Sequence, residues 1–341
     1  IRIIKEIMDH KKLMRTLIVD ASTYRFTTKP NPTVGAMIVN EERVLCTGFH
    51  TKYGYNHAEV ECLNQLDSKD LNKEDRKKLS LLITLEPCCH HGKTPPCTDE
   101  IIKSGIKNVI VGSLDPNPLM SGKGIQVLRD AGIKVKTGVL SNEVKKANHS
   151  FFFKHKNNRP FICIKIAMSN DGMSHSLNGS STWITSKKSR DDVQLLRANY
   201  DAIVTGGNTV RDDNPRMNAR VSYDVNQPRR IVITREKNWD KKMNFFRDSN
   251  FEIVNSYELD EFIKSFQDRD ICSLLIEAGP KLVNSFLDAR LCDQFVIYKS
   301  NKDLGQNGVP WFQNKNEIIK KGFKLKARSY IESDVKEVYT I

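Results

Sequence analysis

The alternation of short apolar runs with amphipathic stretches constrains the fold of this chain more than any other feature. In the first half, runs typical of strands alternate with helical patterns. The expected strands are 36–39, 44–47, 81–85, 108–112 and 135–137, and the expected helices are 11–22, 57–66, 98–103 and 124–130. Thr98 is expected to cap the third of these helices and Gly105 to end it. This order predicts a layered α/β domain.

One polar segment interrupts the rhythm. Residues 149–160 contain His155-Lys-Asn-Asn-Arg-Pro160, a polar sequence that ends in proline and is typical of a linker. Beyond it, a second series of strands (161–167, 202–205, 230–234, 274–277) and helices (186–197, 281–287) begins. The length of 341 residues suits two domains. We therefore expect one α/β domain at residues 1–150 and another at 151–341.

Composition excludes two classes of protein. The apolar runs fall short of the roughly 18 residues that a membrane span needs, and the sequence opens with no charged-then-apolar leader. Neither a membrane protein nor a secreted precursor is therefore expected. Eight cysteines are too few for a disulfide scaffold, which favours a reducing cytoplasm. A cluster of cysteines would then indicate a metal site or catalysis.

The net charge of +13 is spread along the chain. Lys and Arg exceed Asp and Glu by 23 − 17 = 6 in residues 1–150 and by 31 − 24 = 7 in the remainder. The basic runs are short and lie in polar surroundings, so a solvated basic surface is the simplest interpretation. Binding of nucleic acid and attraction of a phosphorylated small molecule are the two alternatives.

The strongest chemical signal lies in the first half, where His57-Ala58-Glu59 precedes Pro87-Cys88 and Pro96-Cys97. One imidazole and two thiolates can hold zinc and leave its fourth position for water, as catalytic zinc sites do. Glu59 can approach this position without binding the metal and shuttle protons. Zinc-dependent nucleobase deaminases have this pattern of His-x-Glu followed by Pro-Cys and a second Cys.

The spacing of the two cysteines departs from that pattern. Eight residues separate Cys88 from Cys97, whereas two are usual in the nucleobase deaminases. The insert can fold out as a loop if Cys88 ends a strand and Cys97 begins a helix. A structural zinc staple or a chance gathering of thiols is the alternative. Cys89, His90 and His91 offer further ligands, but a fourth protein ligand would close the site to water.

The second half contains no nucleophile–base triad and no Gly-x-Gly-x-x-Gly fingerprint. Its clearest feature is Ile276-Glu-Ala-Gly-Pro-Lys281, a strand, a turn of small residues and a helix start. Such a turn can bind an anion such as a cofactor pyrophosphate, although an ordinary turn has the same pattern. Lys165 lies inside an apolar strand and Glu277 ends another. We expect them to pair, the alternative being that Lys165 reaches solvent.

Several motifs together resemble the bifunctional deaminase–reductases of riboflavin biosynthesis. In the first half these are Pro30-Asn-Pro-Thr-Val-Gly35, His57-Ala-Glu59, the long insert between Cys88 and Cys97, Asp115-Pro-Asn-Pro118 and Gly122-Lys-Gly124. In the second half they are Ser169-Asn-Asp-Gly172, Trp183-Ile-Thr-Ser186, Asp192 with Arg197, and Thr209-Val210 with Asp213 and Pro215. The resemblance covers nearly the whole chain. Cys89 stands where the family more often has a small hydroxyl residue.

The resemblance implies a cytidine-deaminase-like three-layer α/β/α domain followed by a reductase domain that looks like dihydrofolate reductase. The first would hydrolyse the ring amino group of a diaminopyrimidinone ribosylamino phosphate, using Zn²⁺ on His57, Cys88 and Cys97 with Glu59 as the catalytic acid–base. The second would reduce the ribose to a ribityl chain with NADPH.

The resemblance also implies binding residues. NADPH would contact Ala167, Trp183, Thr209, Asp213, Gly279, Pro280, Lys281, Leu282, Val283, Asn284 and Ser285. The substrate would contact Ser181, Arg197, Met217, Arg220 and Glu277. From the residues themselves, Asn31 in its proline-rigid loop offers a donor and an acceptor to a pyrimidine edge, and an ordinary turn is the alternative. We place Lys165 and Glu277 at the ribose carbon that is reduced. For Trp183, a plain core aromatic is the alternative.

Two other functions compete with this one. The first is a tRNA deaminase with a non-catalytic accessory domain, which the long insert and the evenly spread charge disfavour. The second is a deaminase whose second half only regulates or oligomerises. The expected partners are the phosphorylated pyrimidine and other copies of this chain, in a dimer or tetramer, with no nucleic acid and no membrane. The expected location is the cytoplasm.

Overall fold

The chain forms two compact units, residues 1–156 and 157–341. The computed structural model describes residues 9–69, 71–90, 95–118, 120–177, 183–255, 258–312 and 317–341. The division falls a little beyond the expected one because 149–157, expected as part of an irregular linker, forms helix α8 (His149–Asn157). Phe151 and Phe152 pack against the core of the first unit, and Asn158 takes a left-handed φ of 53° after the helix.

The first unit is built on a mixed five-stranded sheet in the order β2-β1-β3-β4-β5. Strand β1 pairs antiparallel with both neighbours, whereas β3, β4 and β5 are parallel. The strands are β1 (Gly35–Val39), β2 (Val44–Phe49), β3 (Ser80–Leu85), β4 (Asn108–Ser113) and β5 (Lys134–Lys136). Strands β1, β3 and β4 are almost fully buried, which is expected of strands covered on both faces.

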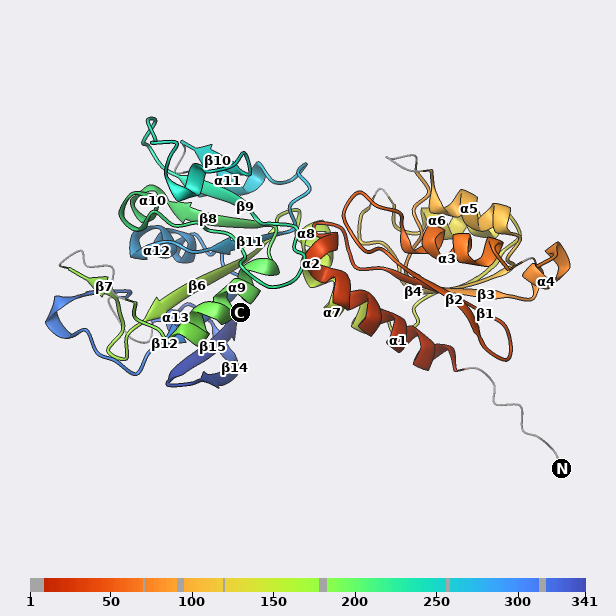
Figure 1. Ribbon diagram of the computed structural model, residues 1–341, viewed down its shortest axis with the longest axis horizontal. Helices are drawn as coiled ribbons and strands as arrows, with labels where there is room; N and C mark the ends of the chain where they lie inside the picture. The colour runs from red at the N-terminus through yellow and green to blue at the C-terminus, as the bar shows by residue number, and fades with distance from the viewer. Residues whose placement is uncertain are drawn as a thin grey trace, which may run out of the picture. The chain divides into compact units, whose positions relative to one another are not determined.

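Helices cover both faces of this sheet, so the unit has three layers (Figure 1). One core contains residues of α3, α5 and α6, and the other contains residues of α1 and α7. The helices are α1 (His10–Ala21), α2 (Arg25–Thr28), α3 (Ala58–Asp67), α4 (Lys73–Lys77), α5 (Cys97–Ser104), α6 (Lys123–Asp130), α7 (Ser141–Ala147) and α8.

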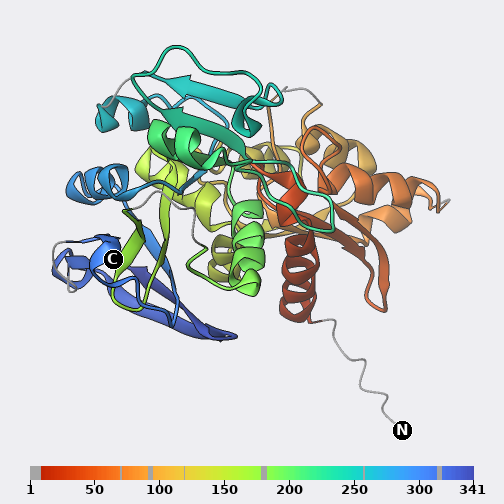
Figure 2. The ribbon, with the colours of Figure 1, turned by 60° about the vertical axis from the view of Figure 1, so that its left-hand side comes forward.

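The second unit is built on an eight-stranded sheet in the order β10-β9-β8-β11-β6-β12-β15-β14. The first six strands of this order are parallel, and β15 and β14 are antiparallel to their neighbours. Figure 2 shows β9 and β10 (teal) at one edge and the β14–β15 hairpin (blue) at the other. The strands are β6 (Phe161–Met168), β8 (Ala202–Gly206), β9 (Arg229–Ile233), β10 (Phe251–Val254), β11 (Ser273–Ile276), β12 (Gln294–Lys299), β14 (Lys324–Ile331) and β15 (Asp334–Thr340).

Two cores flank this second sheet. Helices α11 and α12 contribute to one, and α9 and α10 to the other. A separate two-stranded ribbon pairs β7 with β13. The remaining elements are β7 (Met173–Ser176), β13 (Gly308–Pro310), α9 (Lys187–Ala198), α10 (Gly207–Asp213), α11 (Leu259–Lys264), α12 (Pro280–Asp288) and α13 (Glu317–Lys320).

The expected elements all occur within a few residues of their predicted bounds, but one capping residue was wrong. Helix α5 begins at Cys97, its N-cap is Pro96, and the buried hydroxyl of Thr98 makes no hydrogen bond. Thr98 lies inside the first turn, where a side chain is badly placed to accept the free N–H groups of that turn. Gly105 ends the helix as expected, with φ of 82°. Several elements were not predicted, among them β7, β10 and β12–β15.

Helix α3 packs so closely on β2 that Gly48 has no room for a side chain. A Cβ at this position would lie 2.4 Å from both the Ala58 carbonyl oxygen and the Cys62 backbone nitrogen. We therefore expect Gly48→Ala to lower the free energy of unfolding of the first unit by about 1–3 kcal/mol, the usual cost of overpacking. Thermal unfolding followed by circular dichroism measures this. Thr47→Ala, on the same strand, is the matched control, and equal transition temperatures for the two variants would contradict the account.

Candidate active sites

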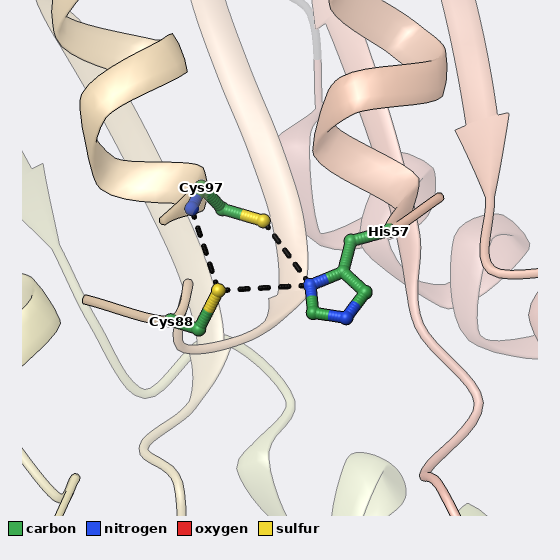
Figure 3. A group of neighbouring side chains, drawn as sticks. All are labelled: His57, Cys88 and Cys97. Atoms are coloured by element: carbon green, nitrogen blue, oxygen red, sulfur yellow. Dashed lines mark hydrogen bonds between the residues drawn. The ribbon is translucent and has the colours of Figure 1, made fainter. Parts of the chain in front are cut away.

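His57, Cys88 and Cys97 come together at the carboxyl end of β3. Their ligand atoms all lie within 4.8 Å of one another (Figure 3). His57 is the N-cap of α3, Cys88 follows β3, and Cys97 is the first residue of α5. The Nδ1 atom of His57 lies 3.2 Å from the Sγ of Cys97 and 3.6 Å from the Sγ of Cys88. Cys88 therefore follows a strand end and Cys97 begins a helix, as predicted, while residues 91–94 between them lie outside the described residues.

The electrostatics of this cluster suit a soft metal ion. The hydrogen bond with the Cys97 thiol is the main cause that lowers the pKa of Cys88, to about 4, and His57 acts in the same direction. The backbone N–H of Cys97 also donates to the Cys88 sulfur, at 3.3 Å. The same contact between the thiols, together with burial, raises the pKa of the Cys97 thiol. Two thiols and an imidazole at these distances fit Zn²⁺, which binds thiolates and neutral imidazole.

Glu59 lies in the first turn of α3, beside the cluster but outside its ligand set. Its side chain is buried, and its carboxyl group interacts with the thiol of Cys97. Burial raises the pKa of Glu59 to about 7, while His57 acts in the opposite direction. A carboxyl group placed in this way can both take up and release a proton near neutral pH.

Asn31 is held by a histidine that no sequence motif identifies. His50 is buried, and its Nδ1 lies 3.0 Å from the carbonyl oxygen of Asn56. Because a carbonyl only accepts, Nδ1 must donate, which leaves Nε2 as the acceptor for the Asn31 amide at 3.3 Å. The ring of His50 also meets that of His57 edge-on, with centroids 5.6 Å apart. The role of His50 depends on where β2 ends, which is why the sequence alone did not reveal it.

Cys89 and His90, the two further potential ligands of the insert that the structure describes, do not belong to the cluster. Cys89 is half-buried and His90 is exposed, and neither belongs to the group of neighbouring ligand atoms. His91 lies outside the described residues.

In the second unit, Glu277 binds two cations. It accepts hydrogen bonds from Nε and Nη2 of Arg197 at 2.6 and 2.9 Å, and Lys165 Nζ lies 3.4 Å from its Oε2. Burial acts to raise the pKa of Glu277, but Arg197 and Lys165 outweigh it and lower the pKa to about 2. Burial lowers the pKa of Lys165. Lys165 therefore pairs with Glu277 as expected, rather than reaching solvent.

Most of the predicted NADPH residues follow the carboxyl ends of two neighbouring parallel strands, β8 and β11. Helix α10 follows β8 and contains Thr209 and Asp213, while α12 follows β11 and begins at Pro280. The N-terminus of α12 has no acidic residue in its first turn, and a Cβ at Gly279 would meet nothing within 4 Å. An open helix N-terminus of this kind fits a pyrophosphate. The predicted residues on this helix and its cap are Gly279, Pro280, Lys281, Leu282, Val283, Asn284 and Ser285.

Trp183 is 71% exposed, which excludes a core role. The guanidinium of Arg190 lies 4.4 Å from the centre of its ring. Such a cation on one face orders the ring and leaves the opposite face for another planar group. A nicotinamide or adenine ring is a planar group that could stack on this face of Trp183.

Of the remaining predicted residues, Met217 contacts the arginine of the Arg197–Glu277 pair. Arg197 Nη2 lies 3.9 Å from the sulfur of Met217, and Arg220 is exposed and donates to Asn218. Ala167 lies near the end of β6, where its carbonyl accepts from the Trp311 indole at 2.7 Å. Ser181 lies outside the described residues.

Two family models match this chain, one in each unit. The zinc-binding region of cytidine and deoxycytidylate deaminases matches residues 7–113, and the RibD C-terminal domain matches residues 160–335. The second match alone covers half of the sequence. The riboflavin biosynthesis protein RibD of Aquifex aeolicus is 38% identical over 319 residues, which cover 87% of this chain and 88% of the relative. The chain belongs to the RibD family.

Other RibD proteins agree with this assignment. The Escherichia coli RibD is 33% identical over 83% of this chain and 85% of its own length. The Acinetobacter baumannii RibD structure matches with a TM-score of 0.86 and 31% identity, covering 97% of this chain and 98% of that one. A Thermotoga maritima diaminohydroxyphosphoribosylaminopyrimidine deaminase/5-amino-6-(5-phosphoribosylamino)uracil reductase matches with a TM-score of 0.78 and 31% identity, covering 97% and 99%.

The family confirms the expected fold and class of function. The chain is a RibD-type bifunctional enzyme of riboflavin biosynthesis, with a cytidine-deaminase-like α/β/α domain and an α/β reductase domain. A tRNA deaminase with a non-catalytic accessory domain is not favoured, because the second half matches a RibD domain of its own. Within the described residues, no helix has both the length and the apolar character to cross a bilayer.

The zinc ligands can be tested one at a time. We expect about one zinc per chain, and single alanine substitutions at His57, Cys88 and Cys97 should each remove it, because a three-ligand site has none to spare. Cys89→Ala should keep the metal, since Cys89 lies outside the ligand group. Zinc content by atomic emission on each purified variant measures this. Loss of zinc from Cys89→Ala with retention by Cys97→Ala would overturn the ligand assignment.

Proposed function

We propose that the first unit hydrolyses the ring amino group of a diaminopyrimidinone ribosylamino phosphate to a carbonyl, and that the second reduces the ribosyl chain of the product with NADPH to give a ribitylamino-uracil phosphate. Two RibD relatives, 38% and 33% identical to this chain, support this pair of reactions, as does the Thermotoga protein, which is named as both a deaminase and a reductase. The observation that carries the proposal is the meeting of His57, Cys88 and Cys97 beside Glu59 in a chain that also has the RibD reductase domain.

In the deaminase unit, the roles follow from position. His57, Cys88 and Cys97 would hold zinc, which when bound supplies the Lewis acid that activates water at neutral pH. Glu59 would move the protons, from water to the ring nitrogen and to the departing amine. Asn31 would bind the pyrimidine edge. The side-chain NH₂ group of Asn31 donates to Nε2 of His50, which leaves the side-chain oxygen of Asn31 to accept from the substrate.

In the reductase unit, the cluster of Lys165, Arg197 and Glu277 would recognise the opened ribose. NADPH when bound supplies the hydride. Lys165 and Glu277 would lie at the carbon that is reduced, where the ammonium group of Lys165 can donate to the ribose oxygen. Arg197 orients the Glu277 carboxylate through two hydrogen bonds, and Arg220 is exposed and can bind the phosphate. The N-terminus of α12, Thr209, Asp213 and Trp183 would bind the cofactor.

The direct test is incubation of the purified protein with the pyrimidinone phosphate, with and without NADPH, followed by mass spectrometry. Without NADPH, we expect only exchange of the amino group for a carbonyl. With NADPH, we expect two further hydrogens and loss of absorbance of the reduced nicotinamide. Deamination without reduction would reject the reductase half of the proposal. A cytoplasmic location and a homo-oligomer stay predictions, which cell fractionation and light scattering address.

The two binding roles in the reductase can be separated by a pair of arginines on α9. Arg197→Ala leaves Glu277 with only Lys165, so we expect the KM for the deaminated intermediate to rise by tenfold or more, roughly the value of a charged hydrogen bond. Arg190→Ala removes the cation from the Trp183 ring and should raise the KM for NADPH instead. Steady-state kinetics with each reactant varied in turn measures both. Equal effects on both reactants in both variants would mean that the roles are misassigned.

The two chemistries should also be separable. Glu59→Gln removes the proton shuttle and should lower deamination by about 10²–10⁴-fold, the usual contribution of a general acid–base. Reduction of added deaminated intermediate by this variant should stay within a few-fold of the unmodified protein. Lys165→Ala should do the reverse, because Lys165 is on β6 of the other unit. If folded Glu59→Gln failed to reduce the added intermediate, a composite site would replace the two-site account.

A further inference from the structure

Glu86 directly follows β3 and lies two residues before the zinc ligand Cys88, yet the proposed chemistry gives it no role. Its side chain is 6% exposed. Oε2 accepts the backbone N–H groups of Asp115 and Gly122 at 3.1 and 3.0 Å, and Oε1 accepts those of Gly124 and Ile125 at 3.0 and 3.3 Å. All four donors come from residues 115–125, so this buried carboxylate binds a distant part of the chain and not its own strand.

Three of the four donors belong to the two motifs that the proposed function left unexplained, and the fourth, Ile125, directly follows the second motif. Asp115 begins Asp-Pro-Asn-Pro, and Gly122 and Gly124 belong to Gly-Lys-Gly at the start of α6. Helix α6 begins at Lys123, so the negative carboxylate of Glu86 also lies at the positive N-terminus of this helix, where it is favourable. A single side chain therefore joins both motifs to the segment that follows β3 and contains Cys88.

Gly124 provides independent evidence for this joint. A Cβ at Gly124 would lie 2.2 Å from the carbonyl oxygen of Pro87 and 3.3 Å from Oε1 of Glu86. Only glycine lets the start of α6 approach the Pro87-Cys88 corner so closely. Two separate contacts therefore hold the start of α6 against the segment 86–88: the hydrogen bonds to the Glu86 carboxylate and the close backbone contact at Gly124.

The fastened segment lies beside the candidate zinc site. The start of α6 meets the carbonyl oxygen of Pro87 at Gly124, and Pro87 directly precedes the ligand Cys88. The ligand Cys88 itself is held by other contacts. Its carbonyl accepts from the Thr98 N–H at 3.1 Å, and its sulfur accepts from the Cys97 N–H at 3.3 Å. Glu86 can therefore place the segment without holding the metal.

We propose that Glu86 is a positioning residue of the deaminase site, which fixes residues 115–118 and 122–124 as a wall against which the pyrimidine phosphate binds. This inference rests on the proposed deaminase function. It assigns Glu86 no contact with substrate and no part in proton transfer. Its effect is on substrate affinity rather than on zinc or on the chemical step.

Glu86→Gln tests this with little change of shape. An amide has one accepting oxygen, so one of the two pairs of N–H groups would face an NH₂ group and lose its acceptor. We expect the KM for the pyrimidinone phosphate to rise about tenfold, the cost of an unpaired buried donor, while kcat stays within about threefold. Zinc content and reductase activity should not change. Gly124→Ala, which opens the same joint from its other side, should show the same split.

Two measurements separate positioning from mere loss of stability. Leu128→Val removes one methylene from the core beneath the same helix, at a residue that is not one of the four donors, so it should lower the unfolding temperature without raising KM. In a Glu59→Gln background, calorimetry reports the Kd for the pyrimidinone phosphate without turnover. Binding should weaken about tenfold on addition of Glu86→Gln.

The outcomes distinguish this inference from the function on which it rests. If the unmodified chain deaminates and both Glu86→Gln and Gly124→Ala retain its KM and Kd, the inference is wrong. Loss of zinc from Glu86→Gln would also overturn it, by assigning Glu86 to the metal site. If the unmodified chain neither binds nor deaminates the pyrimidinone phosphate, the proposed function fails first and this inference with it.

Discussion

The close packing of α3 on β2 is the constraint on which the first site depends. The missing side chain at Gly48 lets the backbone of β2 reach that of α3 around Ala58 and Cys62. This contact sets the level at which α3 begins and so places both His57, its N-cap, and Glu59, in its first turn. The two thiols arrive from the other direction, at the end of β3 and the start of α5. The metal cluster is thus a meeting of two helix N-termini at one strand end.

The second site depends instead on compensation of buried charge. Lys165, Arg197 and Glu277 come from β6, from α9 and from the end of β11, and each is costly to bury alone. Arg197 binds both oxygens of Glu277, which leaves Lys165 the weaker partner at 3.4 Å. Removal of Glu277 would leave two buried cations without their anion, whereas removal of Arg197 would leave Glu277 with only its weaker partner.

Much of this arrangement could be predicted from sequence because it is encoded locally. The α/β order, the strand end before Cys88 and the helix start at Cys97 all follow from short apolar patterns and from the motif itself. The pairing of Lys165 with Glu277 followed from the cost of a lysine in an apolar strand. The edge strand β14 could not be found in this way, because seven of its eight residues are exposed and its lysines and arginine interrupt any apolar run. Neither could His50 and Glu86, whose partners lie at Asn31 and at residues 115–125 and depend on tertiary contacts.

The two buried carboxyl groups show how one residue type serves two chemistries. Burial acts on Glu59 and Glu277 in the same direction, toward the neutral acid. For Glu277 two cations reverse that effect and hold the pKa near 2, so the group is a fixed negative charge at any physiological pH. For Glu59 the neighbouring thiols and the single imidazole do not reverse it, and the pKa stays near 7. A fixed charge is suited to orienting Lys165 and a polar substrate, whereas a group that exchanges its proton near neutrality is suited to hydrolytic deamination. The difference lies in the number of cations within reach of each carboxyl group, and it agrees with the division of the two reactions between the two units.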